Sequence, residues 1–372
     1  GDSMSEQTSN RMRALRPFES RDYRLLFMAV GIEVFGTGMW TIVMVFQVLA
    51  LDDSPLALSA VATGMSLGLF LFSIFGGVVA DRFSKRKIII TVQGLTAAMM
   101  TGVAILSMTG TIELWHVGAA SFVMGAGSAF FYPAYSAYLP HVLPPEQLLA
   151  ANGLEGALRP SMGQGLGPAL GGVIVGLFFP AIGAVIVAGC YAIAFVITLF
   201  PRHRDEAMRS AQPEDRPDMW GDLRAGVKYV VHTRWLLWTL IFGSSLALIV
   251  QGPIEVLLPF LTRERFDDAE ATFGFLLAAY GIGGAIGSLT VSSLKLPRRH
   301  LTFMILCWGG GTLPLGLIGA ADNLFVMLAA LFLVPMLVAG ILRFTDHHPQ
   351  INRQKGELLQ PPADLRDMSP RL

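Results

Sequence analysis

Residues 76–87 read GGVVADRFSKRK, and this stretch decides how the rest of the chain is interpreted. A glycine-rich apolar run ends here, and one acid and several bases follow it at once. Glycines permit close packing between helices, whereas charged side chains avoid the interior of a bilayer. We therefore expect an apolar helix to leave a membrane at this stretch.

The composition supports an integral membrane protein. Of 372 residues, 53% are hydrophobic and only 15% are charged, and the mean hydropathy is +0.56. A soluble domain carries about 25% charged residues. The formal net charge is zero, which gives no support for a nucleic-acid partner.

Long apolar segments recur along the chain. A spanning helix needs about 20 mostly apolar residues, and by that standard about ten segments qualify: 25–50, 57–80, 88–109, 117–139, 160–179, 181–200, 236–261, 273–294, 301–318 and 324–342. The alternating pattern of a membrane barrel is absent. The predicted fold is an all-α bundle of transmembrane helices.

Basic residues gather in alternate connections, which predicts the orientation. They lie in the N-terminal arm, after the second helix, after the sixth and after the eighth: Arg11, Arg13, Arg16, Arg21, Arg24; Arg82, Lys85, Arg86, Lys87; Arg202, Arg204, Arg209, Arg216, Arg224, Lys228, Arg234; Lys295, Arg298, Arg299. The other connections are short or acidic. We expect a multi-pass protein of the plasma (inner) membrane with both termini in the cytoplasm.

The same segments divide the chain. We expect a cytoplasmic arm, a six-helix bundle, a cytoplasmic linker with an interfacial helix, an incomplete four-helix half and a polar tail: 1–21, 22–200, 201–235, 236–342 and 343–372. A plain soluble helix in the linker is an equal alternative. The stretches 75–88 and 286–301 resemble each other weakly, as repeats in secondary transporters do.

The opening stretch resembles a known loop signature. Its pattern of glycine, acid and bases resembles the loop between helices two and three of the major facilitator superfamily, with Ser84 where that family usually has glycine: Gly77, Asp81, Arg82, Lys85, Arg86 and Lys87. The resemblance implies two pseudo-symmetric helical halves and a cytoplasmic gate loop. A positive-inside anchor would explain the bases, but not the acid or the glycine spacing.

A second stretch, SMGQGLGPALGG, lies in the expected fifth helix. It resembles the antiporter motif of drug:proton exporters in that superfamily: Gly163, Gly167, Pro168, Gly171 and Gly172. Three of these glycines recur every four residues and share one helix face, and the proline permits a bend. Ordinary small-residue packing is the alternative. With Asp22-Tyr23-Arg24 before helix one, the resemblance to the siderophore- and drug-exporter branch implies proton-driven efflux of amphipathic small molecules.

Glu33 is the candidate proton-coupling residue. It lies about nine residues, or ~13 Å, into the first span, near the bilayer midplane. An ionisable residue at that depth is costly and usually functional. The exporter branch often has an acid after the glycine in this helix, where this chain has Gly36-Thr37. The alternative is a glutamate that only hydrogen-bonds polar neighbours.

Other polar and aromatic residues of the spans are candidates for a substrate cavity. Gln251 and Glu255 lie four apart and flank Pro253, whereas Glu155 and Arg159 lie at the expected start of helix five and can pair with each other. Further possible cavity residues are Phe46, Gln47, Gln93, Phe130, Phe131 and Tyr132. Aromatic residues in membrane helices more often serve packing.

Enzyme signatures are absent from the sequence. There is no GxxxxGK[ST], HExxH or GxSxG, so we expect no enzyme, no metal and no cofactor, with a proton gradient as the energy source. Cys190 and Cys307 lie in apolar runs and predict neither a disulfide nor a metal pair. The expected partners are a small-molecule substrate, protons and lipid, with a monomeric protein.

The superfamily has twelve spans, and after Leu342 this sequence is polar. We expect a truncated or frame-disrupted product; the alternative is that another protomer completes the site. The alternatives for function are a non-transporting membrane protein, or a facilitator or importer of the same fold.

Overall fold

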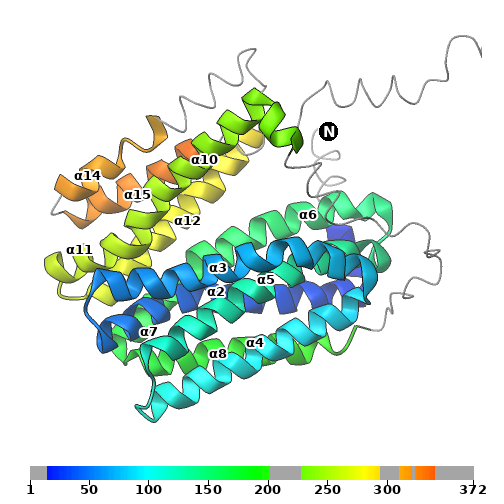
Figure 1. Cartoon of the computed structure of the whole chain (residues 1–372), viewed down its shortest axis with the longest axis horizontal. Helices are drawn as coiled ribbons and strands as arrows, with labels where there is room; N and C mark the ends of the chain where they lie inside the picture. Colours follow the sequence, from blue (N-terminus) through cyan, green and yellow to red (C-terminus); the bar gives the residue numbers. More distant parts are fainter. Residues whose placement is uncertain (1–14, 202–227, 294–309, 321–322, 340–372) are drawn as a thin grey trace, which may run out of the picture.

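The computed structural model describes residues 15–201, 228–293, 310–320 and 323–339. These residues form helices and short connections, without a strand among them (Figure 1). The helices lie roughly alongside one another in two groups. The all-α fold that the sequence predicts is confirmed.

The first group contains η1 (Arg16–Glu19), α2 (Arg21–Leu51), α3 (Pro55–Arg82), α4 (Lys85–Met108), α5 (Leu114–Val142), α6 (Pro145–Arg159), η2 (Pro160–Leu166), α7 (Gly167–Leu177) and α8 (Pro180–Thr198). The second group contains α10 (Arg234–Gly252), η4 (Pro253–Leu257), α11 (Leu258–Arg265), α12 (Ala269–Ser293), α14 (Leu315–Ala320) and α15 (Leu324–Ala339). Element η1 is a 3₁₀-helix, whereas η2 and η4 are π-helices that continue the α-helices on either side.

Serine caps begin the first three long helices. The side chains of Ser20, Ser54 and Ser84 accept hydrogen bonds from backbone N–H groups of the first turns of α2, α3 and α4. Each cap satisfies a donor that the helix itself leaves unpaired. Pro55 and Pro180 occupy the first positions of α3 and α8, where a missing N–H costs nothing.

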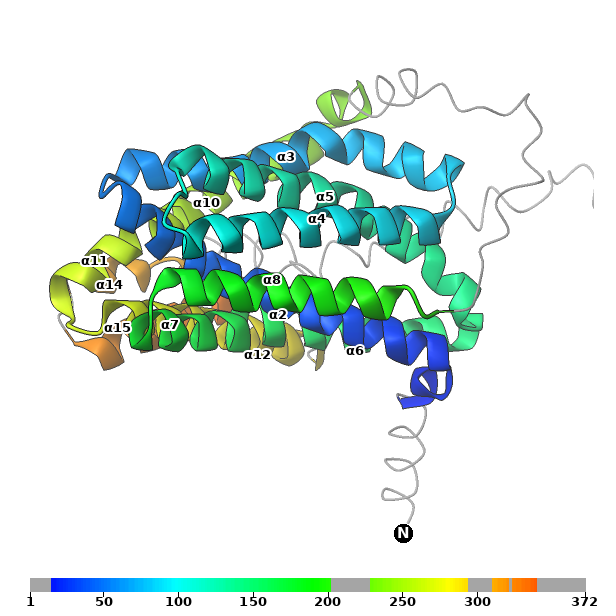
Figure 2. The same cartoon turned by 90° about the horizontal axis from the view of Figure 1, so that it is seen from below.

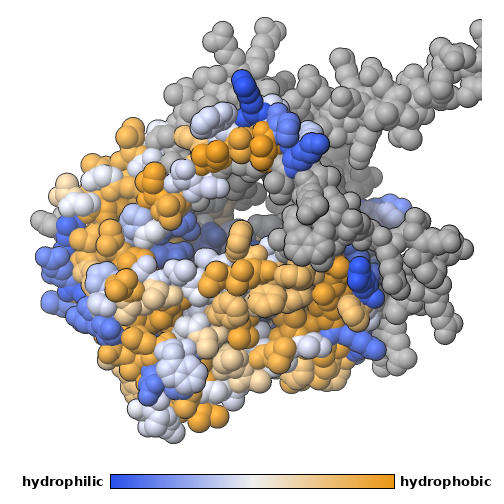
Figure 3. All heavy atoms as spheres, viewed as in Figure 1, coloured by the Kyte–Doolittle hydropathy of each residue, from blue (hydrophilic) through white to orange (hydrophobic). Residues whose placement is uncertain are grey.

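Seven helices are long and apolar enough to cross a membrane, and a shorter apolar helix covers Leu324–Met336, in the part of the chain that is described. Many large apolar side chains on these helices point outward, including Phe70, Trp238 and Leu248, which are 74%, 66% and 75% exposed. Such exposure suits contact with lipid. Figure 3 shows apolar residues over the helix flanks and hydrophilic residues toward the ends of the bundle.

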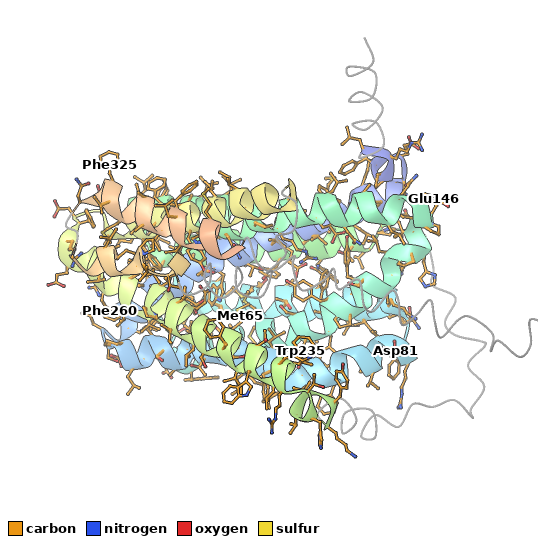
Figure 4. The ribbon with its side chains drawn as sticks, turned by 90° about the horizontal axis from the view of Figure 1, so that it is seen from above. Met65, Asp81, Glu146, Trp235, Phe260 and Phe325 are labelled. Carbon is orange, nitrogen blue, oxygen red and sulfur yellow. The ribbon has the colours of Figure 1, made fainter. Side chains whose placement is uncertain are left out.

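The helices place their connections at two opposite ends. One end carries Asp53 and the connections 109–113, 178–179 and 266–268, and we call it the Asp53 end. The other, the Arg82 end, carries connections 83–84, 143–144 and 199–201. Figure 4 shows Asp81 and Glu146 at the Arg82 end, far from Phe260 and Phe325. The basic residues of the loop after α3 therefore share one end with the residues after α8.

The buried core consists of two clusters. The larger joins both groups, because Met39 and Phe46 of α2 belong to it together with Ile254, Phe273 and residues of α15. The smaller, which includes Tyr23, Ile89 and Tyr138, contains first-group residues alone. Among the described residues, the two groups thus pack together toward the Asp53 end. The surface is hollowed between the groups (Figure 3).

The fifth span begins earlier than the sequence predicts. The expected helix starts at residue 160, but helical structure runs from Pro145 through α6, η2 and α7. Hydropathy misses this first part because Glu146, Glu155 and Arg159 interrupt its apolar residues. Glu155 therefore lies about 15 Å along the helix from Pro145, and the expected position of Glu155 and Arg159 at the start of helix five is wrong.

Several sequence predictions lie wholly or partly outside the described residues. They are most of the N-terminal arm, most of the linker with its interfacial helix, the loop with Lys295, Arg298 and Arg299, the start of the ninth expected span with Cys307, and the polar tail. Of the ninth span, α14 is described, and it is preceded by a turn at 312–314.

Candidate transport site

Helix α7 lies between the two groups and contacts both through glycine. A Cβ atom at Gly167 would come within 2.7 Å of the carbonyl oxygen of Phe35 in α2. A Cβ atom at Gly172 would lie 2.5 Å from the carbonyl oxygen of Glu270 and 3.0 Å from the Cα of Gly274, both in α12. Figure 2 shows α7 beside α12 and α8. Only glycine permits these backbone approaches.

Two other glycines of the motif, one in η2 and one in α7, also lie against α2. Gly163 faces Val34 of α2, and Gly171 faces Met39 and Ile42 of the same helix. The three glycines spaced by four thus lie against α2. Pro168 is buried and lines a cavity.

Two π-helical segments interrupt long helices, one in each group. Element η2 begins at Pro160 and η4 begins at Pro253. Proline has no N–H to donate to the preceding turn, and its ring crowds that turn. The wider π-helical turn accommodates this, and such turns are frequent at functional sites. Gln164 of η2 and Glu255 of η4 both line the cavity between the groups.

This central cavity has a volume of about 270 Å³. Both groups contribute to its wall: Thr37, Trp40, Thr41, Met44, Val45, Ala62, Met65, Ser121, Gly163, Gln164 and Pro168 from the first, and Gln251, Ile254, Glu255, Phe273, Leu277 and Tyr280 from the second. Met65 lies midway along the bundle (Figure 4). The wall is largely apolar with a few polar groups, which is the usual character of a small-molecule site.

A second cavity, also of about 270 Å³, adjoins the first within the first group. We call it the Glu33 cavity; Glu33, Val34, Thr37, Met65, Ser128, Phe131, Tyr132, Arg159, Pro160, Gly163 and Gln164 line it. Thr37, Met65, Gly163 and Gln164 line both cavities. The two spaces are therefore neighbours separated by these side chains.

Glu33 has a specific partner, Gln93, although Gln93 itself lines neither of the two cavities. The Gln93 side chain of α4 donates a hydrogen bond from Nε2 to Oε2 of Glu33 over 2.6 Å. Gln93 is 2% exposed, and its Oε1 atom has no hydrogen-bond partner among the described residues. The contact joins α2 to α4 and holds the Glu33 carboxyl group at the cavity wall.

Arg159, the last residue of α6, lies at the same cavity wall. Its guanidinium carbon is 4.8 Å from the centre of the Tyr132 ring, and its Nη2 atom is 3.7 Å from Oε2 of Glu155. The pairing of Glu155 with Arg159 that the sequence suggests is therefore present. Glu155 also accepts a 2.6 Å hydrogen bond from the hydroxyl group of Tyr135.

Thr37 follows Gly36 in α2, at the position where the exporter branch that the sequence resembles often has an acid. Its hydroxyl group is 2.7 Å from the hydroxyl group of Tyr191 in α8 and donates to the Glu33 carbonyl oxygen over 3.0 Å. A hydrogen-bonded threonine thus stands one turn beyond the glutamate.

Gln251 and Glu255 both line the central cavity, as their shared helix face predicts. The hydroxyl group of Tyr280 in α12 donates to Oε1 of Gln251 over 2.9 Å. Gln47 and Phe130 line neither of the two cavities. Gln47 accepts a 2.6 Å hydrogen bond from Ser107, and the Phe130 ring packs 5.7 Å from that of Phe72.

The loop motif lies at the Arg82 end. Asp81 and Arg82 are exposed in the last turn of α3, and Lys87 is exposed in the first turn of α4, next to Lys85. Arg86 donates to the carbonyl oxygen of Leu199 over 2.9 Å and so ties α4 to the end of α8. A Cβ atom at Gly77 would meet nothing within 4 Å, whereas one at Gly76 would meet the Ala129 carbonyl oxygen of α5. The close helix approach thus occurs at Gly76.

Residues 12–337 match the family described as "Transmembrane secretion effector". The chain belongs to this family of the major facilitator superfamily. Secretion effectors of this superfamily are membrane transporters rather than enzymes. In the described ranges, no group of three His, Cys, Asp or Glu residues could hold a metal ion.

Two enterobactin exporters are among the proteins that this chain resembles. The chain is 27% identical to the enterobactin exporter EntS of Shigella boydii serotype 18 over 334 residues, which is 87% of this chain and 76% of that protein. The identity to EntS of Escherichia coli O139:H28 is 26% over the same shares.

Solved structures support the fold. The nucleoside transporter NupG has a TM-score of 0.66 at 13% identity, over 91% of this chain and 86% of NupG. A bacterial homologue of the human lysosomal transporter Spinster has a TM-score of 0.60 at 17% identity, over 91% and 78% of the two chains. The secretion effector is thus a multi-pass transporter of the major facilitator fold.

Sequence reasoning missed several residues of the two cavities. Trp40, Met65 and Tyr280 carry no motif, and their apolar surroundings resemble those of packing residues. Gln164 gave a usable signal, because it is a polar residue within the glycine-rich motif of the fifth span. Arg159 was a candidate from sequence, but its contact with Tyr132 joins α6 to α5 and carries no signal in the sequence.

Proposed function

We propose that this secretion effector exports small amphipathic molecules, such as drugs or siderophore-like compounds, across the inner membrane in exchange for protons. The family description and the exporter names of the relatives support the outward direction. The glycine motif of α7 supports exchange rather than uniport, since it resembles that of drug:proton exporters.

The observation that carries the proposal is the position of Glu33. A carboxyl group stands in the wall of a cavity that adjoins the space between the two groups, and Gln93 fixes its orientation. An ionisable group at membrane depth marks a proton or substrate pathway by default. Glu33 can bind a proton from one side and release it to the other when access changes.

Alternating access follows from how the two groups meet. The groups, within 22–200 and 236–342, share a core toward the Asp53 end and leave a hollow between them. The positive-inside rule assigns the Arg82 end to the cytoplasm. The described arrangement is then inward-facing, with the loop of Gly77, Asp81, Arg82, Lys85, Arg86 and Lys87 as a cytoplasmic gate and α7 as the pivot.

Transport in inside-out membrane vesicles tests this function. Hoechst 33342, an amphipathic aromatic dye, is added outside vesicles whose lumen is acidified. We expect uptake into the lumen that collapses when the pH gradient is dissipated. Glu33→Gln should abolish gradient-driven uptake but retain dye exchange at equal pH. Glu146→Gln makes the same change at an exposed glutamate at the Arg82 end and should transport normally.

Four outcomes contradict the proposal. Gradient-driven uptake by Glu33→Gln would remove Glu33 from coupling. Transport that does not depend on the pH gradient would identify a facilitator. Dye movement toward the cytoplasmic face would identify an importer. Dye binding without transport would identify a non-transporting membrane protein.

A further inference from the structure

The Tyr132 side chain is far more open than the aromatic residues next to it in α5. It is 47% exposed, whereas its neighbours Phe131 and Tyr135 are 4% and 3% exposed. Tyr132 lines the Glu33 cavity, with Val34 and Met65 among the apolar residues around it. An open aromatic face on an apolar cavity wall suits stacking against another planar ring.

The guanidinium group of Arg159 covers one face of this ring, and the 47% exposure is what remains with that group in place. Its carbon lies 4.8 Å from the ring centre, which is a cation–π contact. A bound aromatic ring and the guanidinium group cannot cover the same face together. The position of Arg159 therefore decides whether a ligand can stack on this face of the Tyr132 ring.

Arg159 is held weakly where it lies. Its acidic partner Glu155 is 3.7 Å away, which is too far for a hydrogen bond. One oxygen of Glu155 is already bound by the Tyr135 hydroxyl group. The contact of the guanidinium group with Glu155 is thus a long ion pair rather than a well-formed hydrogen bond. An arginine has five N–H donors, so most of its bonding capacity is open to a better acceptor.

Glu33 is that acceptor, because it lines the same cavity as Arg159. One of its oxygens accepts from Gln93, and a charged carboxylate has further acceptor sites. Arg159 from α6, which pairs with Glu155, and Tyr132 from α5 line the Glu33 cavity. Tyr191 from α8 is linked to the Glu33 backbone through Thr37, and α4 contributes the uncharged Gln93. A charged Glu33 attracts the guanidinium group, and a neutral Glu33 does not.

We propose that the Tyr132 ring binds an aromatic ring of the exported molecule, and that Arg159 covers this ring when Glu33 is protonated and leaves it when Glu33 is charged. The ligand class is an amphipathic molecule with a planar aromatic group. The rest of the ligand extends into the central cavity past Thr37, Met65 and Gly163, which line both spaces.

This inference rests on the proposed function and supplies its coupling step. Proton and substrate do not compete for one atom; they compete through the side chain of Arg159. Protonation of Glu33 releases Arg159 to the Tyr132 ring and expels the substrate, as an exchanger requires.

Equilibrium binding in lipid nanodiscs tests the inference without any need for transport. The probe is N-phenyl-1-naphthylamine, which is uncharged between pH 6 and 8, so direct attraction to Glu33 does not contribute. Binding to protein-free nanodiscs is subtracted. For the unmodified protein we expect affinity to fall roughly three- to thirtyfold from pH 8 to pH 6, the range that a cation–π contact sets.

Variants of Glu33 and Arg159 distinguish movement of the Arg159 side chain from a direct effect of the Glu33 charge on the probe. Glu33→Gln should bind weakly at both pH values, and Arg159→Gln should bind tightly at both. The double variant should bind as tightly as Arg159→Gln, because without the cover the state of Glu33 no longer matters. Arg159→Lys, which lacks the planar group, should give an intermediate pH effect.

Tyr132→Leu should lose affinity at both pH values, whereas Tyr229→Leu, the same change at an exposed tyrosine outside both cavities, should not. A double variant as weak as Glu33→Gln, or an Arg159→Gln variant that keeps the pH dependence, overturns the inference. If binding fails these tests while gradient-driven transport still requires Glu33, the proposed function stands alone. If the binding pattern holds but transport ignores the gradient, the proposed function fails instead.

Discussion

Arg263 in the last turn of α11 forms an ion pair with Asp53, which lies between α2 and α3. The two residues are 210 positions apart and belong to different groups of helices. Arg265, two residues on, donates to the carbonyl oxygens of Ile318 and Gly319 over 2.8 and 2.9 Å. The ion pair therefore joins the first group to a corner of the second that is itself held together. It lies at the Asp53 end, where the two groups pack together.

Loss of this pair should favour the outward-open state. Both side chains are exposed, at 41% and 64%, and an exposed pair contributes about 0.2–1 kcal/mol. Asp53→Asn should therefore raise the outward-open population roughly 1.5- to 5-fold. Labelling of Thr41→Cys, in the central cavity, by a membrane-impermeant maleimide added to intact cells measures that population.

Exchange of the two charges provides the control. Asp53→Arg alone should increase the labelling of Thr41→Cys, and Asp53→Arg with Arg263→Asp should return it toward the starting value. Equal labelling in all three backgrounds would show that the pair does not hold this end closed.

Packing between α2 and α7 should be intolerant of a methyl group. A Cβ atom at Gly167 would lie 2.7 Å from two backbone oxygens, and neither helix can retreat without moving the rest of its group. Gly167→Ala should therefore destabilise the protein by about 1–3 kcal/mol. Gly153→Ala, in α6, meets nothing within 4 Å and should be neutral or stabilising. Thermal unfolding of purified protein in detergent, followed by size-exclusion chromatography, compares them.

An equal loss of stability in both variants would contradict this explanation. If Gly167→Ala loses transport but keeps its stability, the close contact is needed for movement of α7 rather than for packing.

The parts of the fold that composition controls could be predicted from the sequence. Spans follow from the need for apolar residues in lipid, so α2, α3, α4, α5 and α8 lie close to their predicted ranges. The glycine face of η2 and α7 that lies against α2 also follows, since residues spaced by four lie on one side of a helix. The start of the fifth span does not, because α6 carries charges that a protein cavity, not lipid, accommodates.

The hydrogen bond from Gln93 to Glu33 should matter for transport rather than only for folding. Gln93→Leu removes this bond and leaves Glu33 without its described donor, at a cost of about 1–3 kcal/mol. The Glu33 carboxyl group then loses its fixed position, and gradient-driven Hoechst uptake should fall. Gln47→Leu is the matched change, because Gln47 is also buried and has one 2.6 Å partner, Ser107, outside both cavities.

Uptake normalised to the amount of folded protein separates the two variants. We expect Gln47→Leu to lower the amount and keep the normalised rate, and Gln93→Leu to lower the rate itself. If the two lose normalised rate equally, the bond between Gln93 and Glu33 has no special part in coupling.

Contacts such as this one could not be predicted from the sequence. Glu33 and Gln93 are 60 residues apart, and their meeting depends on the rotation of α2 and α4 about their axes. Hydropathy does not fix that rotation, because both helices are apolar on nearly every face. The contact of Arg159 with Tyr132 depends in the same way on the rotation of α6 relative to α5.

Pro160 should trade stability for function. It begins η2, where its missing N–H and its ring force the helix to widen. Pro160→Ala restores the donor and permits a regular α-helix, which should raise the melting temperature. The same change would rotate Gly163 and Gln164 relative to the two cavities that they separate, so transport should fall.

Pro180→Ala, at the first position of α8, is the control. It removes a proline that costs the helix nothing and should alter neither the melting temperature nor transport. If Pro160→Ala is more stable and transports at the normal rate, the π-helical turn is not needed for transport.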